Sequence, residues 1–191
     1  MLRADPVMGG GRPTPLDGSR VPQVLAPGCA DRGGVYPFCG NPDGMEEGAL
    51  RIRPLTAADY DALISLWVDA GLPYRPNGRD RQDRIAREIE GPCSEFLAAE
   101  VDGRLVGAVL GTHDGRKGWI NRLAVCPGHR NRGIGQALVD EVERRLAERG
   151  IAITTCLIET WNEPSMAFFE HAGYVRHDDC VYYSKRKDPN I

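Results

Sequence analysis

The pattern of apolar and polar positions along the chain changes near residue 49. The first 48 residues contain ten glycines and seven prolines and almost no periodic apolar positions. Such a segment buries too little apolar surface to offset the entropy that is lost on ordering. We therefore predict a disordered tail over residues 1–48 and one folded domain over residues 49–187. Met45 stands just before the change in pattern, which leaves open a start of translation there.

From residue 50 onward, segments with an apolar period of two alternate with segments of period near 3.6, which are typical of strands and helices. Thr56 and Asp59 form a capping pattern for the first helix, and Asp102-Gly103 favours the type I′ turn of a hairpin. Helices are expected at 57–70, at 81–90, from Ile134 onward and from Pro164 onward. Strands are expected at 50–55, on both sides of the hairpin turn, and at 119–125, 151–159, 174–176 and 181–185. This order predicts an α/β (α+β) domain, with helices packed on a mixed sheet.

Composition and charge limit the classes of partner. The 191 residues are 41% hydrophobic and 27% charged, and they contain no apolar run of about 18 residues that could span a membrane. The 24 basic and 27 acidic residues leave a formal net charge of −3, so we expect neither nucleic acid nor membrane as a partner. The six cysteines are scattered without a Cys-x-x-Cys pair, which favours a reduced cytoplasm. A homodimer is left open.

A loop with two glycines precedes the helix that starts at residue 134. Apolar residues spaced by four give this helix a face for packing on a core: Ile134, Leu138, Val142 and Leu146. Packing therefore holds the first turn in place, and its N–H groups point toward the loop. Gly133 and Gly135 allow a ligand to approach the backbone closely, while Arg130 and Arg132 add positive charge. The loop is suited to binding a pyrophosphate.

Three nucleotide-binding motifs compete for this loop, and two of them fail. A Rossmann loop needs a glycine where Arg130 stands and a third small residue where Leu138 stands. A P-loop needs Gly-Lys-Ser/Thr, which is absent. The remaining pattern is R-x-x-G-x-G over residues 130–135. Together with the segments "INRLAV" and "NEPSMAFFEHAGY", it resembles the GNAT superfamily of acetyl-coenzyme A dependent N-acyltransferases.

The resemblance covers residues 50–186 and implies a mixed, mostly antiparallel sheet of six to seven strands, flanked by helices on both faces. It implies acetyl-coenzyme A as the cosubstrate and an amine as the acceptor. The backbone of three strand residues would pair with the pantetheine arm: Leu123, Ala124 and Val125. The loop would hold the pyrophosphate through Arg130, Asn131, Arg132, Gly133, Ile134, Gly135 and Gln136. Asn162 would hydrogen-bond the cofactor arm, with a helix cap as the alternative role.

Acyl transfer requires a neutral amine, and this requirement depends on the acceptor. An α-amine with a pKa near 8 is about 10% neutral at pH 7, whereas a lysine amine is neutral only about 0.04% of the time. A general base therefore matters more for lysine, which is the less favoured acceptor. Glu159, at the carboxyl end of the strand expected at 151–159, is the candidate base, and a surface carboxylate is the alternative. His113 and Asp114 are weaker candidates because they form a turn.

The chain departs from the superfamily motif at Phe169. A tyrosine that protonates the departing thiolate commonly stands at this position, and phenylalanine has no proton to donate. Tyr182, Tyr183 or a water molecule would replace it, or the thiolate would leave unaided. The same departure raises a second hypothesis, a non-catalytic sensor that binds an acyl-coenzyme A.

Acceptor specificity is expected in the loop between the first two helices. Tyr74, Arg75 and Arg79 are candidates to bind an aromatic ring or a carboxylate, and a solvated loop is the alternative. His129 and His171 lack the spacing of metal ligands, so no metal is expected.

Overall fold

The computed structural model describes residues 49–185 and residue 187, so the predicted tail, residues 1–48, lies outside the described residues. The strands are β1 (Arg51–Pro54), β2 (Ser94–Val101), β3 (Arg104–His113), β4 (Gly118–Val125) and β5 (Thr154–Cys156). The helices are α1 (Tyr60–Asp69), α2 (Gln82–Ile89), α3 (Ile134–Glu148) and α4 (Glu163–His171), with short 3-10 helices at Ala57–Asp59 and Pro127–His129.

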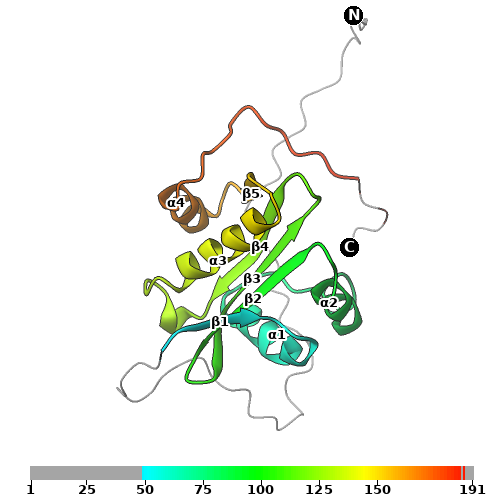
Figure 1. Ribbon diagram of the computed structural model, residues 1–191, viewed down its shortest axis with the longest axis vertical. Helices are drawn as coiled ribbons and strands as arrows, with labels where there is room; N and C mark the ends of the chain where they lie inside the picture. Colours follow the sequence, from blue (N-terminus) through cyan, green and yellow to red (C-terminus); the bar gives the residue numbers. More distant parts are fainter. Residues whose placement is uncertain (1–48, 186, 188–191) are drawn as a thin grey trace, which may run out of the picture. The chain divides into compact units, whose positions relative to one another are not determined.

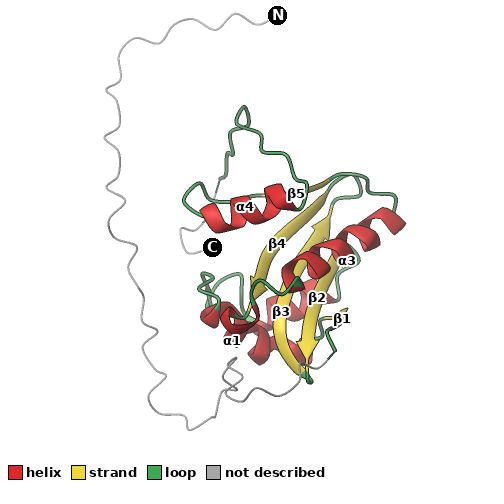
Figure 2. Ribbon diagram, turned by 90° about the vertical axis from the view of Figure 1, so that its left-hand side faces the viewer, coloured by secondary structure: helices red, strands yellow, loops and turns green. Residues whose placement is uncertain are grey.

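The described strands form one sheet in the order β1-β2-β3-β4-β5. The pairings β1-β2, β2-β3 and β3-β4 are antiparallel, and β4 and β5 are parallel. Helices α1 and α2 pack on one face of the sheet and α3 packs on the other (Figures 1 and 2). The predicted α/β class, the mixed and mostly antiparallel sheet, and the helices on both faces are confirmed.

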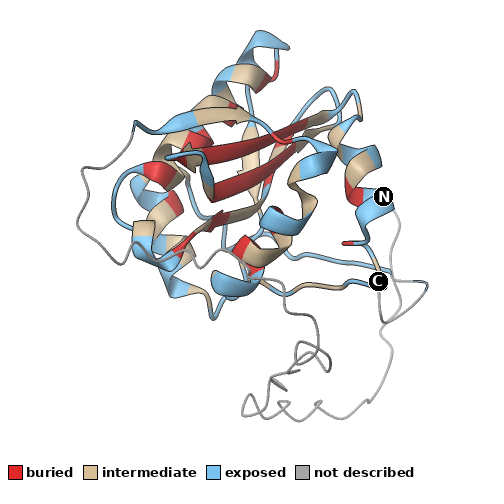
Figure 3. Ribbon diagram, turned by 90° about the horizontal axis from the view of Figure 1, so that it is seen from below, coloured by how far each residue is buried: buried red, intermediate tan, exposed pale blue. Residues whose placement is uncertain are grey.

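The core lies between the sheet and these helices. Helix α1 buries Leu63, Leu66 and Trp67. Helix α3 buries its predicted apolar face, Ile134, Leu138, Val142 and Leu146, and Val139 as well. Figure 3 shows the central strands buried along most of their length. Packing of α3 on the sheet fixes the direction of its amino-terminal end, which is joined to β4 by residues 126–133.

Local signals in the sequence give the expected turn and cap. Asp102 and Gly103 have φ values of 52° and 73°, and Val101 pairs with Arg104, as a type I′ hairpin turn requires. The side chain of Asp59 accepts a hydrogen bond from the backbone N–H of Thr56 at 2.8 Å, which forms the predicted capping box. Arg53 also donates to this carboxylate and holds the pKa of Asp59 down at about 2.

The prediction of strands at 174–176 and 181–185 was wrong: the described sheet has five strands instead of six to seven. Four apolar residues of these two segments are 69% to 87% exposed: Val175, Val181, Tyr182 and Tyr183. A period of two shows which side chains would share a face, but a strand also needs a neighbouring edge and an apolar surface to cover.

The strand expected at 151–159 is present only as Thr154–Cys156. Ile153 still accepts a hydrogen bond from the backbone of Gly118, so the chain runs beside β4 up to Cys156. After Cys156 it leaves β4, and Leu157 is 62% exposed. The apolar pattern continues beyond the point at which the neighbouring strand turns away.

Glycines on the sheet allow α3 to lie close to it. A Cβ atom added at Gly118 would lie 2.3 Å from Leu146 Cδ1. One added at Gly111 would lie 2.8 Å from Val142 Cγ1 and 2.9 Å from the backbone oxygen of Glu95. No real Cβ atom tolerates these separations, so the absence of a side chain sets the spacing between α3 and the sheet.

Gly111→Ala should destabilise the protein by about 1–3 kcal/mol, because the backbone oxygen of Glu95 cannot move away from the new methyl group. Urea denaturation measures the loss. Gly107→Ala is the matched control, since its Cβ would meet only side-chain atoms at 3.1 to 3.3 Å and should cost less. Equal stability of wild type and Gly111→Ala, or a greater loss in the control, would contradict the close approach.

Candidate active site

Strands β4 and β5 pair over a short distance and then separate. The parallel ladder consists of Gly118↔Thr154, Trp119↔Thr155 and Ile120↔Cys156. Beyond Ile120, β4 continues to Val125 and pairs with β3 alone among the described strands. One edge of the backbone from residue 121 to residue 125 is therefore open to an added extended chain.

A β-bulge lies at the start of this open edge. Leu110 pairs with Asn121 and Ala108 pairs with Ala124, so Arg122 and Leu123 together face a single residue of β3. Arg122 has a φ of 49°, in the left-handed region that non-glycine residues seldom adopt. A bulge bends its strand, which explains why β4 turns away from β5 here.

The glycine loop ends in a helix start without a side-chain cap. Asn131 and Gly133 have φ values of 61° and 77°, and the chain then enters α3. Gly133 is the N-cap residue, and the first turn contains no acidic residue. The helix dipole and its first N–H groups thus favour an anion at this position.

Arg130 fixes this loop to the end of β4. Its guanidinium donates from Nε to the carbonyl of Val125 at 3.2 Å and from Nη2 to the carbonyl of Ala70 at 3.3 Å. A Cβ added at Gly135 would lie 3.3 Å from the ring of Phe168 in α4. The loop is therefore positioned by β4, α1 and α4 together.

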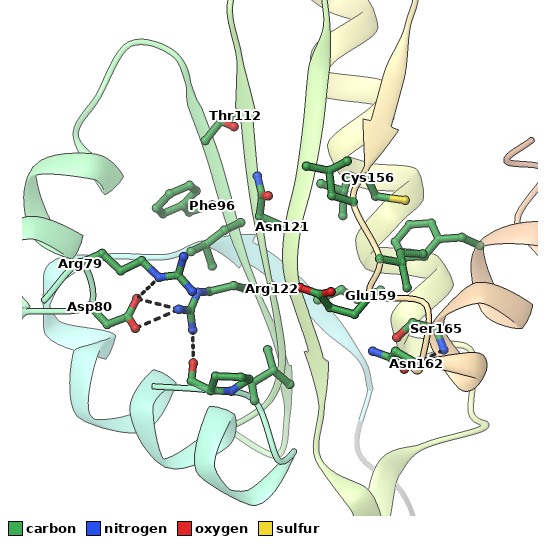
Figure 4. A pocket seen from close by; sticks show the side chains of 18 of the residues that line it. Arg79, Asp80, Phe96, Thr112, Asn121, Arg122, Cys156, Glu159, Asn162 and Ser165 are labelled. Atoms are coloured by element: carbon green, nitrogen blue, oxygen red, sulfur yellow. Dashed lines mark hydrogen bonds and ion pairs between the residues drawn. The ribbon is translucent and has the colours of Figure 1, made fainter. Parts of the chain in front are cut away.

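A cavity of about 450 Å³ opens where β4 and β5 separate (Figure 4). One wall comes from α2 and the loop before it, and the other comes from the segment after β5 and from α4. Polar groups line it through Arg79, Asp80, Glu88, Thr112, Asn121, Arg122, Cys156, Glu159, Asn162 and Ser165. Apolar groups line it through Leu72, Pro73, Ile85, Phe96, Leu110, Ile120, Leu123, Leu157, Ile158, Trp161 and Phe169.

The structure brings some of the predicted site residues to this cavity and leaves others outside. Four of them line it: Leu123, Glu159, Asn162 and Arg79. Tyr74 and Arg75 belong to the same loop as Arg79 but do not line the cavity. Tyr74 instead places its hydroxyl 3.3 Å from that of Tyr60. Tyr182 and Tyr183 are 69% and 87% exposed and also lie outside the lining.

Asn162 acts as the helix cap that was the alternative to a cofactor contact. Its Oδ1 accepts a hydrogen bond from the backbone N–H of Ser165 at 3.2 Å, at the start of α4. Asn162 N–H in turn donates to the carbonyl of Glu159 at 2.8 Å. This turn presents Glu159 to the cavity, and the contact of Asn162 with a cofactor stays a prediction.

Phe169 is buried and lines the cavity. Its ring stands edge-on to Phe168 and Tyr174, with centroids 5.1 and 5.0 Å away. The hydroxyl of Tyr174 donates to Glu143 of α3 at 2.5 Å and does not line the cavity. Phe169 lines the cavity but has no proton to give, and Tyr174 has one but lies outside the lining.

Sequence reasoning missed Asp80, Asn121, Arg122 and Cys156. Burial raises the pKa of the Cys156 thiol to about 11, so the thiol is protonated at neutral pH. Asp80 is 2% exposed and forms an ion pair with Arg122. The lone arginine inside the apolar segment "INRLAV" was the signal that could have found this pair, because a buried charge requires a partner.

Comparisons with known proteins show the family. The sequence profile of the Acetyltransferase (GNAT) family matches residues 59–174. An acetyltransferase from Pectobacterium atrosepticum is 34% identical over 137 residues, which cover 72% of this chain and 95% of the relative. The chain belongs to the GNAT family of acetyltransferases. It is an enzyme of that class, the first of the two hypotheses raised by the sequence.

Solved structures share the fold. The PaiA N-acetyltransferase from Thermoplasma acidophilum, in complex with coenzyme A, is 20% identical with a TM-score of 0.59, over 64% of this chain and 87% of that chain. The aminoglycoside N-acetyltransferase AAC(6′)-Iy, in complex with the bisubstrate analogue CoA-S-monomethyl-acetylneamine, is 18% identical with a TM-score of 0.63. That similarity covers 73% of this chain and 99% of the other.

Two further features concern membranes and metals. Among the described residues, no helix is both long enough and apolar enough to cross a membrane. Within the same residues, no three His, Cys, Asp or Glu side chains form a group that could hold a metal ion.

Proposed function

We propose that this acetyltransferase transfers an acetyl group from acetyl-coenzyme A to a primary amine. The observation that carries the proposal is the uncapped start of α3 beside the open edge of β4, which leads into the cavity. The similar structures of PaiA and AAC(6′)-Iy contain coenzyme A or an analogue built on it, which supports this choice of donor.

The donor would extend from the loop to the cavity. The residues from Arg130 to Gln136 would hold the pyrophosphate through backbone N–H groups and positive charge. The pantetheine arm would then pair with the backbone of Leu123, Ala124 and Val125 as an added strand. One N–H of this segment would donate to the thioester carbonyl oxygen, on which negative charge develops during the reaction.

The amine would attack the thioester carbon from the cavity. A C–N bond forms, the C–S bond breaks, and the amine nitrogen loses a proton. Glu159 would accept that proton, directly or through one water molecule, because it is the carboxylate beside the point where β4 and β5 separate. The coenzyme A thiolate must take up a proton or leave as the anion, and Phe169 cannot supply that proton.

The acceptor would be a small amine or the amino terminus of a peptide, with lysine less favoured. Glu88 and Glu159 place two carboxylates at the cavity, which attract an ammonium group before it loses its proton. Arg79 lies on the same wall as Glu88, across from Glu159. Its side chain is 51% exposed, which suits a carboxylate or a polar edge of the acceptor. A cytoplasmic location and a homodimer stay predictions.

Gly133→Asp should lower the affinity for acetyl-coenzyme A at least about tenfold more than Gly133→Asn does, because only aspartate adds negative charge at the helix start. Both residues tolerate the φ of 77°, and an added Cβ would have no atom within 4 Å. Titration calorimetry measures both affinities. Equal losses in the two variants would contradict a pyrophosphate site at this loop.

A thiol-release assay over a panel of amines tests the function. We expect turnover with a small amine or a peptide amino terminus. Glu159→Gln should reduce kcat/KM at pH 7 about a hundredfold, and less at higher pH, where more of the amine is already neutral. Glu163→Gln, an exposed residue outside the cavity lining, is the matched control. Absence of turnover on every amine would refute the proposal. A Glu159→Gln enzyme with the kcat/KM of wild type would exclude Glu159 as the general base.

Phe169→Tyr restores the proton donor of the family motif with little change in shape. If protonation of the thiolate limits the rate, kcat should rise about tenfold or more. The Tyr182→Phe/Tyr183→Phe variant is the companion measurement. An unchanged rate in Phe169→Tyr together with full activity of the double variant would exclude a tyrosine donor at all three positions and leave water or unaided departure.

A further inference from the structure

Arg122 connects the strand that would bind the donor to the loop that would bind the acceptor. Its backbone forms the bulge in β4, and its side chain reaches the segment between α1 and α2. There Nη1 donates to the carbonyl of Pro73 at 2.9 Å, while Nη2 lies 2.8 and 2.9 Å from the two carboxylate oxygens of Asp80 (Figure 4). One guanidinium therefore holds both ends of this segment.

Asp80 joins the end of the segment between α1 and α2 to the middle of the same segment by hydrogen bonds. Its carboxylate accepts a hydrogen bond from the backbone N–H of Arg75 at 2.8 Å, and its own N–H donates to the carbonyl of Arg75 at 3.3 Å. The carbonyl of Asp80 accepts a hydrogen bond from the hydroxyl of Tyr60 at 2.9 Å. Asp80 is 2% exposed, so its charge needs compensation. Arg122 supplies it at 2.8 Å, whereas the Nε of Arg79 lies 3.9 Å away and that side chain is 51% exposed.

The position of the Arg122 guanidinium is itself fixed. It lies over the ring of Trp67 in α1, with Cζ 4.3 Å from the ring centroid, and Trp67 is fully buried. The planar group thus has the ring on one face and two acceptors at its edge, an arrangement that a lysine ammonium cannot reproduce. These contacts also oppose relaxation of the left-handed backbone at Arg122.

This arrangement determines where one wall of the cavity stands. The segment from Leu72 to Asp80 contributes four lining residues: Leu72, Pro73, Arg79 and Asp80. The residue directly after Arg122 begins the stretch of β4 that would bind the pantetheine arm. The distance between an amine on that wall and a thioester on β4 therefore depends on Arg122.

We propose that Arg122 is a positioning residue for acetyl transfer, which holds the acceptor wall at a fixed place relative to β4 through Asp80 and Pro73. This inference rests on the proposed amine acetyltransferase function. A purely structural ion pair is the competing interpretation, and it predicts that activity follows stability.

Arg122→Lys keeps the positive charge but loses the planar group that stacks on Trp67 and donates to both Pro73 and Asp80. We expect amine kcat/KM to fall about tenfold to a hundredfold, mainly through KM, while the dissociation constant of acetyl-coenzyme A stays within about twofold of wild type. Arg144→Lys is the matched control, because Arg144 forms ion pairs with Glu141 and Glu148 on the exposed side of α3. Arg144→Lys should leave the amine kcat/KM, the amine KM and the dissociation constant of acetyl-coenzyme A unchanged.

The variant Arg122→Met/Asp80→Leu separates positioning from folding. Replacement of both charges by apolar side chains should return the melting temperature toward that of wild type, because no buried charge is left unpaired. Amine kcat/KM should stay low, since the contacts to Pro73 and Arg75 are still missing. Recovery of kcat/KM together with stability would overturn the proposal, as would wild-type amine kinetics in Arg122→Lys.

Hydrogen exchange gives a readout that does not depend on turnover. In Arg122→Lys, the amides of Arg75 and Asp80 should exchange faster, while the amides in the middle of α3 should not change. If the wild-type enzyme acetylates no amine, the proposed function fails, but this exchange experiment still tests the link between Arg122 and the loop. Unchanged exchange at Arg75 and Asp80 would overturn the positioning role.

Discussion

The separation of β4 from β5 is the constraint on which the rest of the site depends. Parallel pairing ends at Ile120 and Cys156, and the next residues of β4 form a bulge whose backbone includes the left-handed Arg122. A backbone edge inside a domain normally pairs with another strand, because unsatisfied N–H and C=O groups are costly when buried. Here the open edge borders a cavity, and an extended substrate arm can supply the missing partner.

Packing of α3 on the sheet places the amino-terminal end of this helix beside the open edge of β4. Because Gly107, Gly111 and Gly118 carry no side chains, α3 lies close to the sheet and its first turn stands beside the end of β4. Arg130 then joins the loop to Val125 and Ala70. The uncapped start of α3 and the open edge are thus held next to each other, which supports the proposal that a phosphate and an extended arm are bound together.

Much of this could be predicted from the sequence, because the relevant signals are local. The hairpin at Asp102, the capping box at Thr56 and the apolar face of α3 each depend on residues a few positions apart, and the structure contains all three. The final strands were not predicted correctly, since a period of two carries no information about whether an edge is available for pairing. The lone Arg122 in an apolar segment indicates that a partner is needed, but its partner Asp80 is 42 positions away and no local pattern identifies it.

Backbone amide exchange with and without saturating acetyl-coenzyme A measures most directly whether the open edge of β4 and the start of α3 bind the donor. We predict slower exchange in two segments, Leu123–Val125 and Gly133–Gln136, and no change in β1 and β2, which lie on the far side of the sheet. Binding of acetyl-coenzyme A that leaves both segments unchanged, or that protects amides elsewhere in the domain instead, would contradict the assignment of this site.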